Sequence, residues 1–298
     1  MQSKPLIHVL FTMDCEPPGG KAAGRSQATW ELSARSIEGF CTRLLNAGYP
    51  STLFLSPACA EEHAPLLEEL SGLGIELGLH LDPQHLGDRR YQDPLGKYDM
   101  EHQQALIEAG LERFRDAIGV RPQSFRPGNF SANDATFDAL FRLGFRQGSV
   151  SSPGRDVPRH AARWSHAPVE AHYVDPHDRL RSGGLPFLEF PVTTDPAKIG
   201  FGGFAHDLCI ESGYFDTWHR PIADRWIERL ASEPVPFPTL CIFTRNHFAY
   251  HRNDDPQSVT LEALLDYCAM LTEQYNVVPI TLAGAHEHFR ELGLGYSS

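Results

Sequence analysis

Short apolar runs alternate with longer amphipathic segments along almost the whole chain, and this alternation restricts the possible folds most strongly. The runs are rich in Val, Ile, Leu and Phe and have the length of buried strands. Repeated strand and helix units place parallel strands side by side and leave the helices outside them. The predicted strands lie at 7–13, 51–55, 75–79, 124–126, 148–151, 187–192, 240–244 and 278–281.

Segments with helical periodicity separate most of these strands. In the first of them, Leu32 and Phe40 lie on one apolar face and Gly48 follows as a stop signal. No internal repeat and no linker typical of a domain boundary interrupts the pattern, so we expect residues 1–298 to form one α/β barrel domain. The predicted helices are 29–47, 60–72, 99–118, 133–143, 221–231 and 259–275.

One segment departs from this pattern. Residues 153–184 are rich in Pro, Gly, His, Arg and Asp and show little periodicity, which predicts a long loop excursion over one face of the barrel. Aromatic residues in this segment and in the late loops could stack on a sugar face or fill the core, namely Trp164, Tyr173, Tyr214 and Trp218.

Charge argues against two classes of partner. The chain has 26 Lys plus Arg and 38 Asp plus Glu, a formal net charge of -12, and no basic run. An acidic surface repels nucleic acid and anionic membranes, so we expect neither nucleic-acid binding nor integral membrane association. The substrate is then expected to be a small molecule or a saccharide.

Cysteine usage and the N-terminal segment favour a cytoplasmic protein. The six cysteines are scattered without a C-x-x-C pair and lie mostly in apolar stretches, which predicts buried free thiols in a reducing compartment. The apolar run that begins at Ile7 is short and ends at Asp14 and Glu16, unlike a secretory signal. No run reaches the roughly 20 apolar residues that cross a bilayer.

Polar side chains gather at positions that follow predicted strands, where active sites of βα barrels form. Asp14 and Glu16 follow the first strand and point to the same side of an extended chain. His80, Asp82 and His85 follow the third strand. Imidazoles and a carboxylate compose the usual open zinc site, and a second carboxylate beside the bound water can accept its proton.

Two further strand ends supply charged groups. Arg126 ends the fourth strand before a Pro-Gly turn, and its guanidinium is suited to holding a carboxylate in place. Asn129 follows in the same turn. His247 comes after the strand at 240–244 and could protonate a leaving amine, with His251 as a competitor. The nucleophile elbow, dinucleotide and phosphate-loop motifs are absent, which leaves metal-assisted hydrolysis.

In this order, the motifs resemble those of the polysaccharide deacetylases, the NodB-homology or carbohydrate esterase family 4 group. The most specific piece is the stretch that begins Ser124-Phe-Arg-Pro-Gly-Asn, similar to the family's arginine motif. The stretch Phe11-Thr-Met-Asp-Cys-Glu is similar to a divergent first motif. The resemblance covers nearly the whole chain and implies the family's distorted TIM-like (β/α)7 barrel.

The resemblance also implies roles for individual residues. Asp14 would be the catalytic base, Arg126 the residue that orients it, and His247 the catalytic acid. Cys15 replaces the family's metal-binding Asp, so Glu16 is the implied substitute. The implied metal site is completed by the histidines of the second motif, which gives the set Glu16, His80 and His85. Asp82 could replace one histidine, and either Asp14 or Glu16 could bind the metal.

The predicted function is a metal-dependent hydrolase that removes an N-acetyl group from an amino sugar. The expected cofactor is one divalent ion, with zinc as the expected metal. The candidate substrate contacts are Asn129, Trp164 and Asp175. A cytoplasmic enzyme of this kind would act on an intracellular saccharide or a surface-polysaccharide precursor of the O-antigen type. Two alternatives are an allantoinase-like or imidase-like hydrolase of a small non-sugar amide and a catalytically decayed carbohydrate-binding barrel.

Overall fold

The computed structural model describes residues 4–19, 29–212 and 214–294 of the chain. Its strands are β1 Leu6–Cys15, β2 Ser51–Leu55, β3 Glu76–Leu81, β4 Ser124–Pro127, β5 Gln147–Gly148, β6 Asp156–Val157, β7 Ala162–Arg163, β8 His172–Val174, β9 Leu185–Glu189, β10 Thr194–Ile199, β11 Ala205–Asp207, β12 Thr239–Arg245 and β13 Asn276–Pro279. Its α-helices are α1 Trp30–Asn46, α2 Pro57–Gly72, α3 Met100–Ile118, α4 Thr136–Arg142, α5 Arg220–Ser232, α6 Pro256–Leu271 and α7 Leu282–Glu291.

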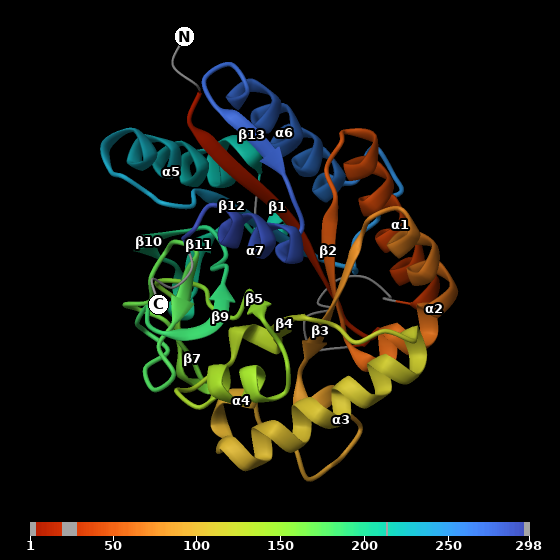
Figure 1. The fold of residues 1–298 in the computed structure, drawn as a ribbon. Coiled ribbons are helices and arrows are strands. Elements are labelled where there is room, and N and C mark those ends of the chain that lie inside the picture. Colours follow the sequence, from red (N-terminus) through yellow and green to blue (C-terminus); the bar gives the residue numbers. More distant parts are fainter. Residues whose placement is uncertain (1–3, 20–28, 213, 295–298) are drawn as a thin grey trace.

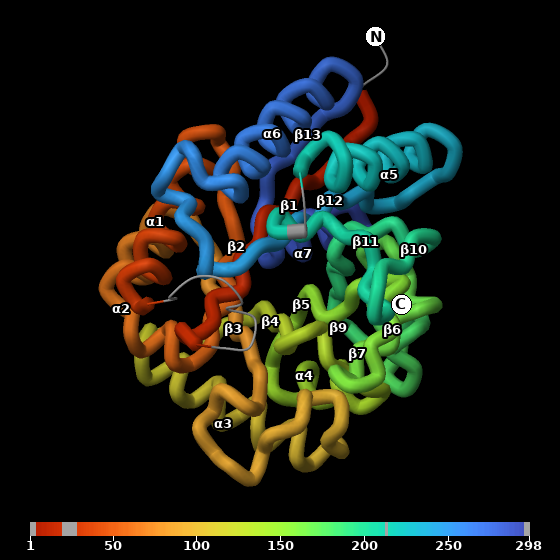
Figure 2. The backbone as a smooth tube through the Cα atoms, turned by 180° about the vertical axis from the view of Figure 1, so that it is seen from behind, coloured from red at the N-terminus to blue at the C-terminus, as the bar shows by residue number. Residues whose placement is uncertain are grey.

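A curled, mostly parallel sheet forms the centre of the molecule (Figure 1). Its strands are hydrogen-bonded in the order β12-β1-β2-β3-β4-β5-β9-β8, and β13 pairs with the first residues of β1. Only β8 pairs antiparallel to its neighbour among the strands of this sheet in the described residues. From behind, the tube shows α1, α2, α3, α5 and α6 arranged around the strands (Figure 2). The predicted fold class, a distorted α/β barrel, is confirmed.

The sheet curls until the segments that follow β9 and β11 reach β12. No strand ladder joins β9 and β12 in the part of the chain that is described, but single backbone contacts cross the gap. Thr193 N donates to Cys241 O at 3.0 Å, and Phe243 N donates to Leu208 O at 3.2 Å. The barrel is therefore closed by loop residues on this side and by strands elsewhere.

Burial on both faces explains why the strands are continuous apolar runs. Every residue of β2 is buried, as are the residues of β1 after Leu6. Sheets covered by helices on one side and filled on the other have this pattern. All six cysteines are free and buried, so the predicted thiols are confirmed.

Helix α7 was not predicted, and a half-buried carboxylate explains its position. Glu76, at the start of β3, accepts hydrogen bonds from Thr52 Oγ1 at 2.8 Å and from Ala283 N at 3.0 Å. Ala283 lies in the first turn of α7, where a carboxylate stabilises the free N–H groups and the positive end of the helix. The contact fixes α7 against the amino ends of the strands, opposite the edge where their carboxyl ends open.

The segment 153–184 has more regular structure than predicted. It contains the antiparallel pair β6 and β7 and the edge strand β8, which extends the central sheet. The short length of these strands gave no periodicity to detect. In the part of the chain that the structure describes, no helix has the length and hydropathy of a membrane-spanning segment.

Candidate active site

The candidate site forms where the carboxyl ends of β1, β3, β4 and β12 meet. Asp14 of β1 is the register partner of Arg245 in β12. His80 of β3 is the register partner of Arg126 in β4. Because parallel strands open their carboxyl ends at one edge of a sheet, these four residues lie at the same edge although they are far apart in the chain.

Asp14 and Arg126 form a buried ion pair at this edge. Arg126 Nη1 donates to Asp14 Oδ1 at 2.8 Å, and the two residues are 0% and 5% exposed, the arginine being the less exposed. The guanidinium also donates to Thr12 Oγ1 at 2.9 Å and to Ser149 Oγ at 2.8 Å. Its Cζ atom lies 4.4 Å from the centre of the Phe54 ring. Arg126 is thus fixed in place, and the carboxylate contact that the sequence predicted for it is present.

Glu16 contacts two histidines, one in β3 and one just after β12. Its Oε1 atom lies 3.3 Å from His80 Nε2, and its Oε2 atom lies 3.4 Å from His247 Nε2. Arg245 Nε is 3.9 Å from the same Oε2 atom. We call Glu16, His80 and His247 the Glu16 cluster. The sequence predicted Glu16 beside His80, but it assigned His247 a separate role as the acid.

The charges around the Glu16 cluster lower the pKa of Glu16 and raise the pKa of His80. Burial alone would raise the pKa of Glu16, but hydrogen bonds from His247 and His80 and the charge of Arg245 hold that pKa well below its ordinary value. Burial alone would lower the pKa of His80, but the nearby carboxylates of Asp14 and Glu16 raise it. Both shifts favour the charged form of the group, against the effect of burial.

Asn246 fixes the backbone that carries Glu16, and sequence reasoning gave it no role. Glu16 N donates to Asn246 Oδ1 at 3.0 Å, and Asn246 Nδ2 donates back to Glu16 O at 3.0 Å. The same amide donates to Ser33 Oγ at 2.7 Å, and that hydroxyl contacts His63 Nε2. Its position directly after β12, between Arg245 and His247, is the sequence feature that could have identified Asn246 as part of the site.

Two adjoining cavities lie at the mouth of the site. The first, of about 500 Å³, is lined by residues that include Glu16, Asp82, His85, Asn129 and Arg245. The second, of about 380 Å³, shares Asn129 and Arg245 with the first. Asp14 is behind this surface, whereas Glu16 is on it. The sizes suit a small-molecule ligand rather than a large macromolecule.

The three predicted substrate contacts have different positions. Asn129 lines both cavities, and its backbone has a positive φ of 57° after the Pro-Gly turn. Trp164 is 0% exposed and donates its ring N–H to Phe130 O at 2.8 Å, so no face of it is open to a sugar. Asp175 accepts hydrogen bonds from the backbone of residues 177 and 178 and holds a turn outside the cavities. Only Asn129 is at the site.

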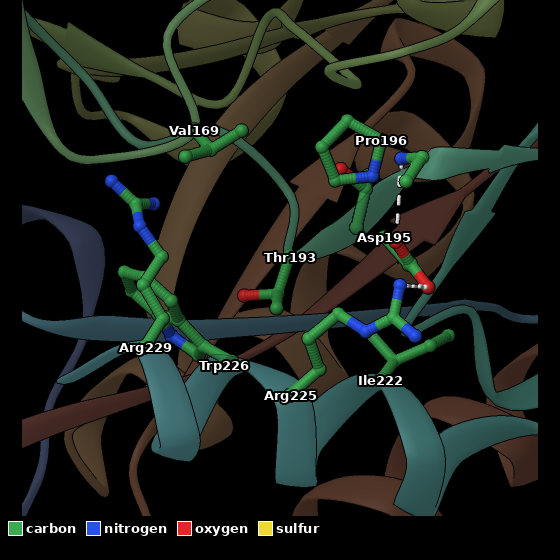
Figure 3. A pocket seen from close by; sticks show the side chains of 10 residues that line it. Val169, Thr193, Asp195, Pro196, Ile222, Arg225, Trp226 and Arg229 are labelled. Carbon is green, nitrogen blue, oxygen red and sulfur yellow. Dashed lines mark hydrogen bonds and ion pairs between the residues drawn. The ribbon is translucent and has the colours of Figure 1, made fainter. Parts of the chain in front are cut away.

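A separate cavity of about 300 Å³ lies between α5 and the start of β10 (Figure 3). Val169, Ile222 and Trp226 give it an apolar wall. Arg225 points to Asp195, and the two form an ion pair of 2.7 Å. None of the residues predicted for the site lines this cavity, so we place the chemistry at the strand ends.

Known structures with similar folds include enzymes of two kinds. A probable polysaccharide deacetylase from Pseudomonas aeruginosa PAO1 superimposes with a TM-score of 0.60 at 14% identity, over 96% of this chain and 91% of that one. The Puue allantoinase superimposes with a TM-score of 0.61 at 14% identity, over 96% of this chain and 90% of that one. Neither a known family nor a curated protein matches the sequence itself.

The chain has the polysaccharide deacetylase fold. Within this fold, Cys15 stands where the resemblance places a metal-binding Asp. Burial raises the pKa of Cys15 well above its ordinary value, and the buried thiol lies 3.9 Å from Met13 O. A metal site in this polysaccharide deacetylase fold would therefore depend on the neighbouring Glu16.

The predicted metal set Glu16, His80 and His85 is not assembled. Glu16 contacts His80, whereas His85 lines the cavity without a hydrogen bond to either. Among the residues that the structure describes, no three His, Cys, Asp or Glu side chains are placed to hold a metal ion. Asp82 caps the turn Pro83–His85 by accepting from Gln84 N. As arranged, these residues do not fit a zinc ion.

Proposed function

We propose that this chain is a hydrolase that removes an N-acetyl group from an amino sugar. The observation that carries the proposal is the buried ion pair of Asp14 and Arg126 beside the Glu16 cluster, at the strand ends of a polysaccharide deacetylase fold. Amide hydrolysis needs a base for water, a donor for the developing oxyanion and an acid for the amine. The site contains a candidate for each.

Asp14 is the proposed base. Arg126 holds one of its oxygens and leaves the other to accept a proton from water. Glu16 is less suited to this step because its pKa is held well below the ordinary value by His247 and His80 against the opposing effect of burial. Both of its oxygens also lie against imidazoles, whereas Asp14 has one oxygen free of Arg126. Asp14 therefore takes the water proton, and Glu16 orients the two imidazoles.

The histidines supply the other two functions. His80, whose pKa is raised by Asp14 and Glu16 against the effect of burial, donates a hydrogen bond to the carbonyl oxygen as negative charge develops on it. His247 gives a proton to the departing amine and is oriented by Glu16. Acetate and a free amino sugar leave the site, and the proton on Asp14 returns to His247 through solvent, so atoms and charge balance with one water consumed.

Zinc stays a prediction, and the reaction above contains no step through it. The direct measurement is elemental mass spectrometry on protein purified without a metal-affinity tag. About one equivalent of zinc in the wild type, lost with His80→Ala and retained with Asp14→Asn, would establish a resident metal and a base role for Asp14. Metal-free protein that takes up neither zinc nor cobalt would refute the predicted cofactor.

An intracellular saccharide or a surface-polysaccharide precursor is the proposed substrate, in a cytoplasmic enzyme. One fold can serve unrelated substrates, and a similar structure is an allantoinase, which supports a small ureide as the second candidate. Acetate release from N-acetylated sugars, compared with ring opening of a cyclic ureide, separates the two. A decayed carbohydrate-binding barrel would bind sugar without either reaction.

The test of the proposed function is acetate release from N-acetylglucosamine oligosaccharides and from nucleotide-linked N-acetyl sugars. We expect Asp14→Asn to reduce the rate by about 100-fold or more, the usual contribution of a general base. Asp138→Asn is the matched control, because Asp138 pairs with Arg142 on the surface of α4. Acetate release by wild type and Asp14→Asn at equal rates would remove Asp14 from the mechanism.

A further inference from the structure

Arg155 is a buried arginine at the site that the proposed reaction does not use. It immediately precedes β6, in the segment that the sequence predicted to cover the barrel face, and it is 5% exposed. Its Cζ atom lies 4.7 Å from the centre of the Phe130 ring and 5.2 Å from that of Phe204. Two aromatic rings thus fix the plane of a buried positive charge.

Few of the donors of Arg155 are well used. Nη1 donates to Asn129 O and Nη2 to Asp207 Oδ2, each at 3.4 Å, and Nε is buried without a hydrogen-bond partner. Good N–H···O bonds measure about 2.7–3.2 Å. By comparison, Arg126 in the same site donates three hydrogen bonds of 2.8–2.9 Å to side chains. A buried guanidinium with two long bonds has donors left for a ligand.

Arg155 lines the second cavity at the mouth of the site, together with Asn129, Asp207, Glu211 and Arg245. Asn129 and Arg245 also line the first cavity, which contains Glu16. A ligand in the second cavity can therefore extend toward the proposed chemistry. Among the described residues, the side-chain amide of Asn129 makes no hydrogen bond and offers a second donor at the boundary between the cavities.

The second cavity contains two arginines and two carboxylates, and the two ion pairs differ in length. Arg245 Nη1 is 2.9 Å from Glu211 Oε2, so that carboxylate is neutralised. Among the described residues, Asp207 is the only carboxylate within 4 Å of the Arg155 guanidinium, and their closest approach is 3.4 Å. A carboxylate or phosphate of a ligand could approach the guanidinium more closely and with two parallel bonds, which a loosely held Asp207 does not make.

We propose that Arg155 binds an anionic group of the substrate, a carboxylate or a phosphate, in the second cavity. The inference rests on the proposed function and narrows its substrate class to acidic or phosphorylated N-acetyl saccharides. Phe130 and Phe204 hold the guanidinium plane, and the anion replaces Asp207 as its partner. Arg155 is therefore a specificity residue and takes no part in proton transfer.

The test is a calorimetric titration of the intact protein with inorganic phosphate and, in a second arm, with glucuronate; glucose is the neutral control ligand. We expect at least one of the two anions to bind the wild type. The anion that binds more tightly shows whether the substrate group is a phosphate or a carboxylate. Arg155→Met should weaken that binding by at least tenfold, and Arg155→Lys should weaken it less because it keeps the charge. Arg163→Met is the matched control, since Arg163 is an exposed arginine whose side chain is 63% exposed.

Asp207→Asn makes the test decisive. If Asp207 competes with the ligand for Arg155, its neutralisation should tighten anion binding by several fold, opposite in sign to the Arg155 variants. If Asp207 and Arg155 only stabilise the fold, both changes should lower the melting temperature and neither should strengthen binding. Should Arg155→Met fail to fold, Arg155→Lys and Asp207→Asn still decide the question.

Two outcomes would overturn the inference. One is that neither anion binds the wild type, and the other is that Arg155→Met binds the better anion with unchanged affinity. These results are separate from the proposed function, because the titration needs no turnover. Anion binding without acetate release would overturn the proposed reaction alone. Equal kcat/KM of the wild type and Arg155→Met on acidic N-acetyl sugars would overturn the role of Arg155 alone.

Discussion

The ion pair of Asp14 and Arg126 predicts a large effect on stability that can be measured without knowing the substrate. Arg126→Met keeps an unbranched, flexible side chain but removes the guanidinium from a fully buried position. Asp14 then loses the donor 2.8 Å from its Oδ1 atom and is left as a buried carboxylate without its counterion. We expect a strong loss of folding free energy.

The magnitude follows from burial and geometry. Removing one partner of a buried pair costs about 3–5 kcal/mol, because the remaining charge stays desolvated. The side chains of Arg126 and Asp14 are 0% and 6% exposed, so solvent screening reduces this cost little. Native domains are stable by about 5–15 kcal/mol, so the loss would be a large fraction of the total. With a urea dependence of about 3 kcal/mol per molar, the midpoint should fall by roughly 1 M.

Urea denaturation followed by circular dichroism measures the shift. Arg142→Met is the matched control, because Arg142 pairs with Asp138 on the surface of α4 and should leave the midpoint nearly unchanged. The double variant Arg126→Met/Asp14→Leu should regain at least ~1 kcal/mol over Arg126→Met, since it removes the unpaired charge. Equal midpoints for Arg126→Met and Arg142→Met would refute the argument that this pair is desolvated.

Further predictions concern residues of the site and its surroundings. Glu16→Gln should destabilise the protein at neutral pH, and the difference from wild type should shrink in acid. The sign follows because His247 and His80, against the effect of burial, hold the folded pKa of Glu16 below its ordinary value of 4.5. Glu16 therefore stabilises the fold above pH 4.5, and this stabilisation is lost as the pH falls through the lower pKa of the folded state. Thermal melts between pH 3 and 7 can measure the change. His247→Ala should reduce kcat by about 100-fold and change KM little, as steady-state acetate release would show, whereas a change in KM alone would contradict an acid role. Trp164→Phe should lower the free energy of unfolding by about 1–3 kcal/mol through loss of its bond to Phe130 O, with KM unchanged, and a raised KM would place the ring at the substrate after all.

The sequence predicted the strands of the sheet to within a few residues and also the order in which their ends carry polar groups. These features are local, because buried strands must be apolar and barrel chemistry follows strand ends. The short strands β6, β7, β8 and β11 escaped prediction because two or three residues show no periodicity. The six-residue strand β10 was also missed, and its residues are mostly exposed. Helix α7 was missed for another reason. Its position depends on Glu76, a residue about two hundred positions earlier in the chain.

The site shows the same division. Asp14, Arg126 and Glu16 could be chosen from their positions after strands, because the carboxyl ends of parallel strands always open at one edge. Which imidazole reaches Glu16 could not be chosen in this way, since His85 and His247 both follow strands. Side-chain direction and strand curvature decide such contacts, and these are properties of the assembled barrel.

The sequence by itself therefore determined the α/β barrel, the buried thiols and the edge at which the chemistry lies, because each follows from hydrophobic periodicity and from the order of polar residues along the chain. Only the tertiary structure decided that Trp164 fills the core, that His247 contacts Glu16 and that Arg155 is buried with unused donors beside the cavity. Those facts depend on distances between segments far apart in the chain. Such distances are set by how the sheet curls and how the loops pack, and no local pattern records them.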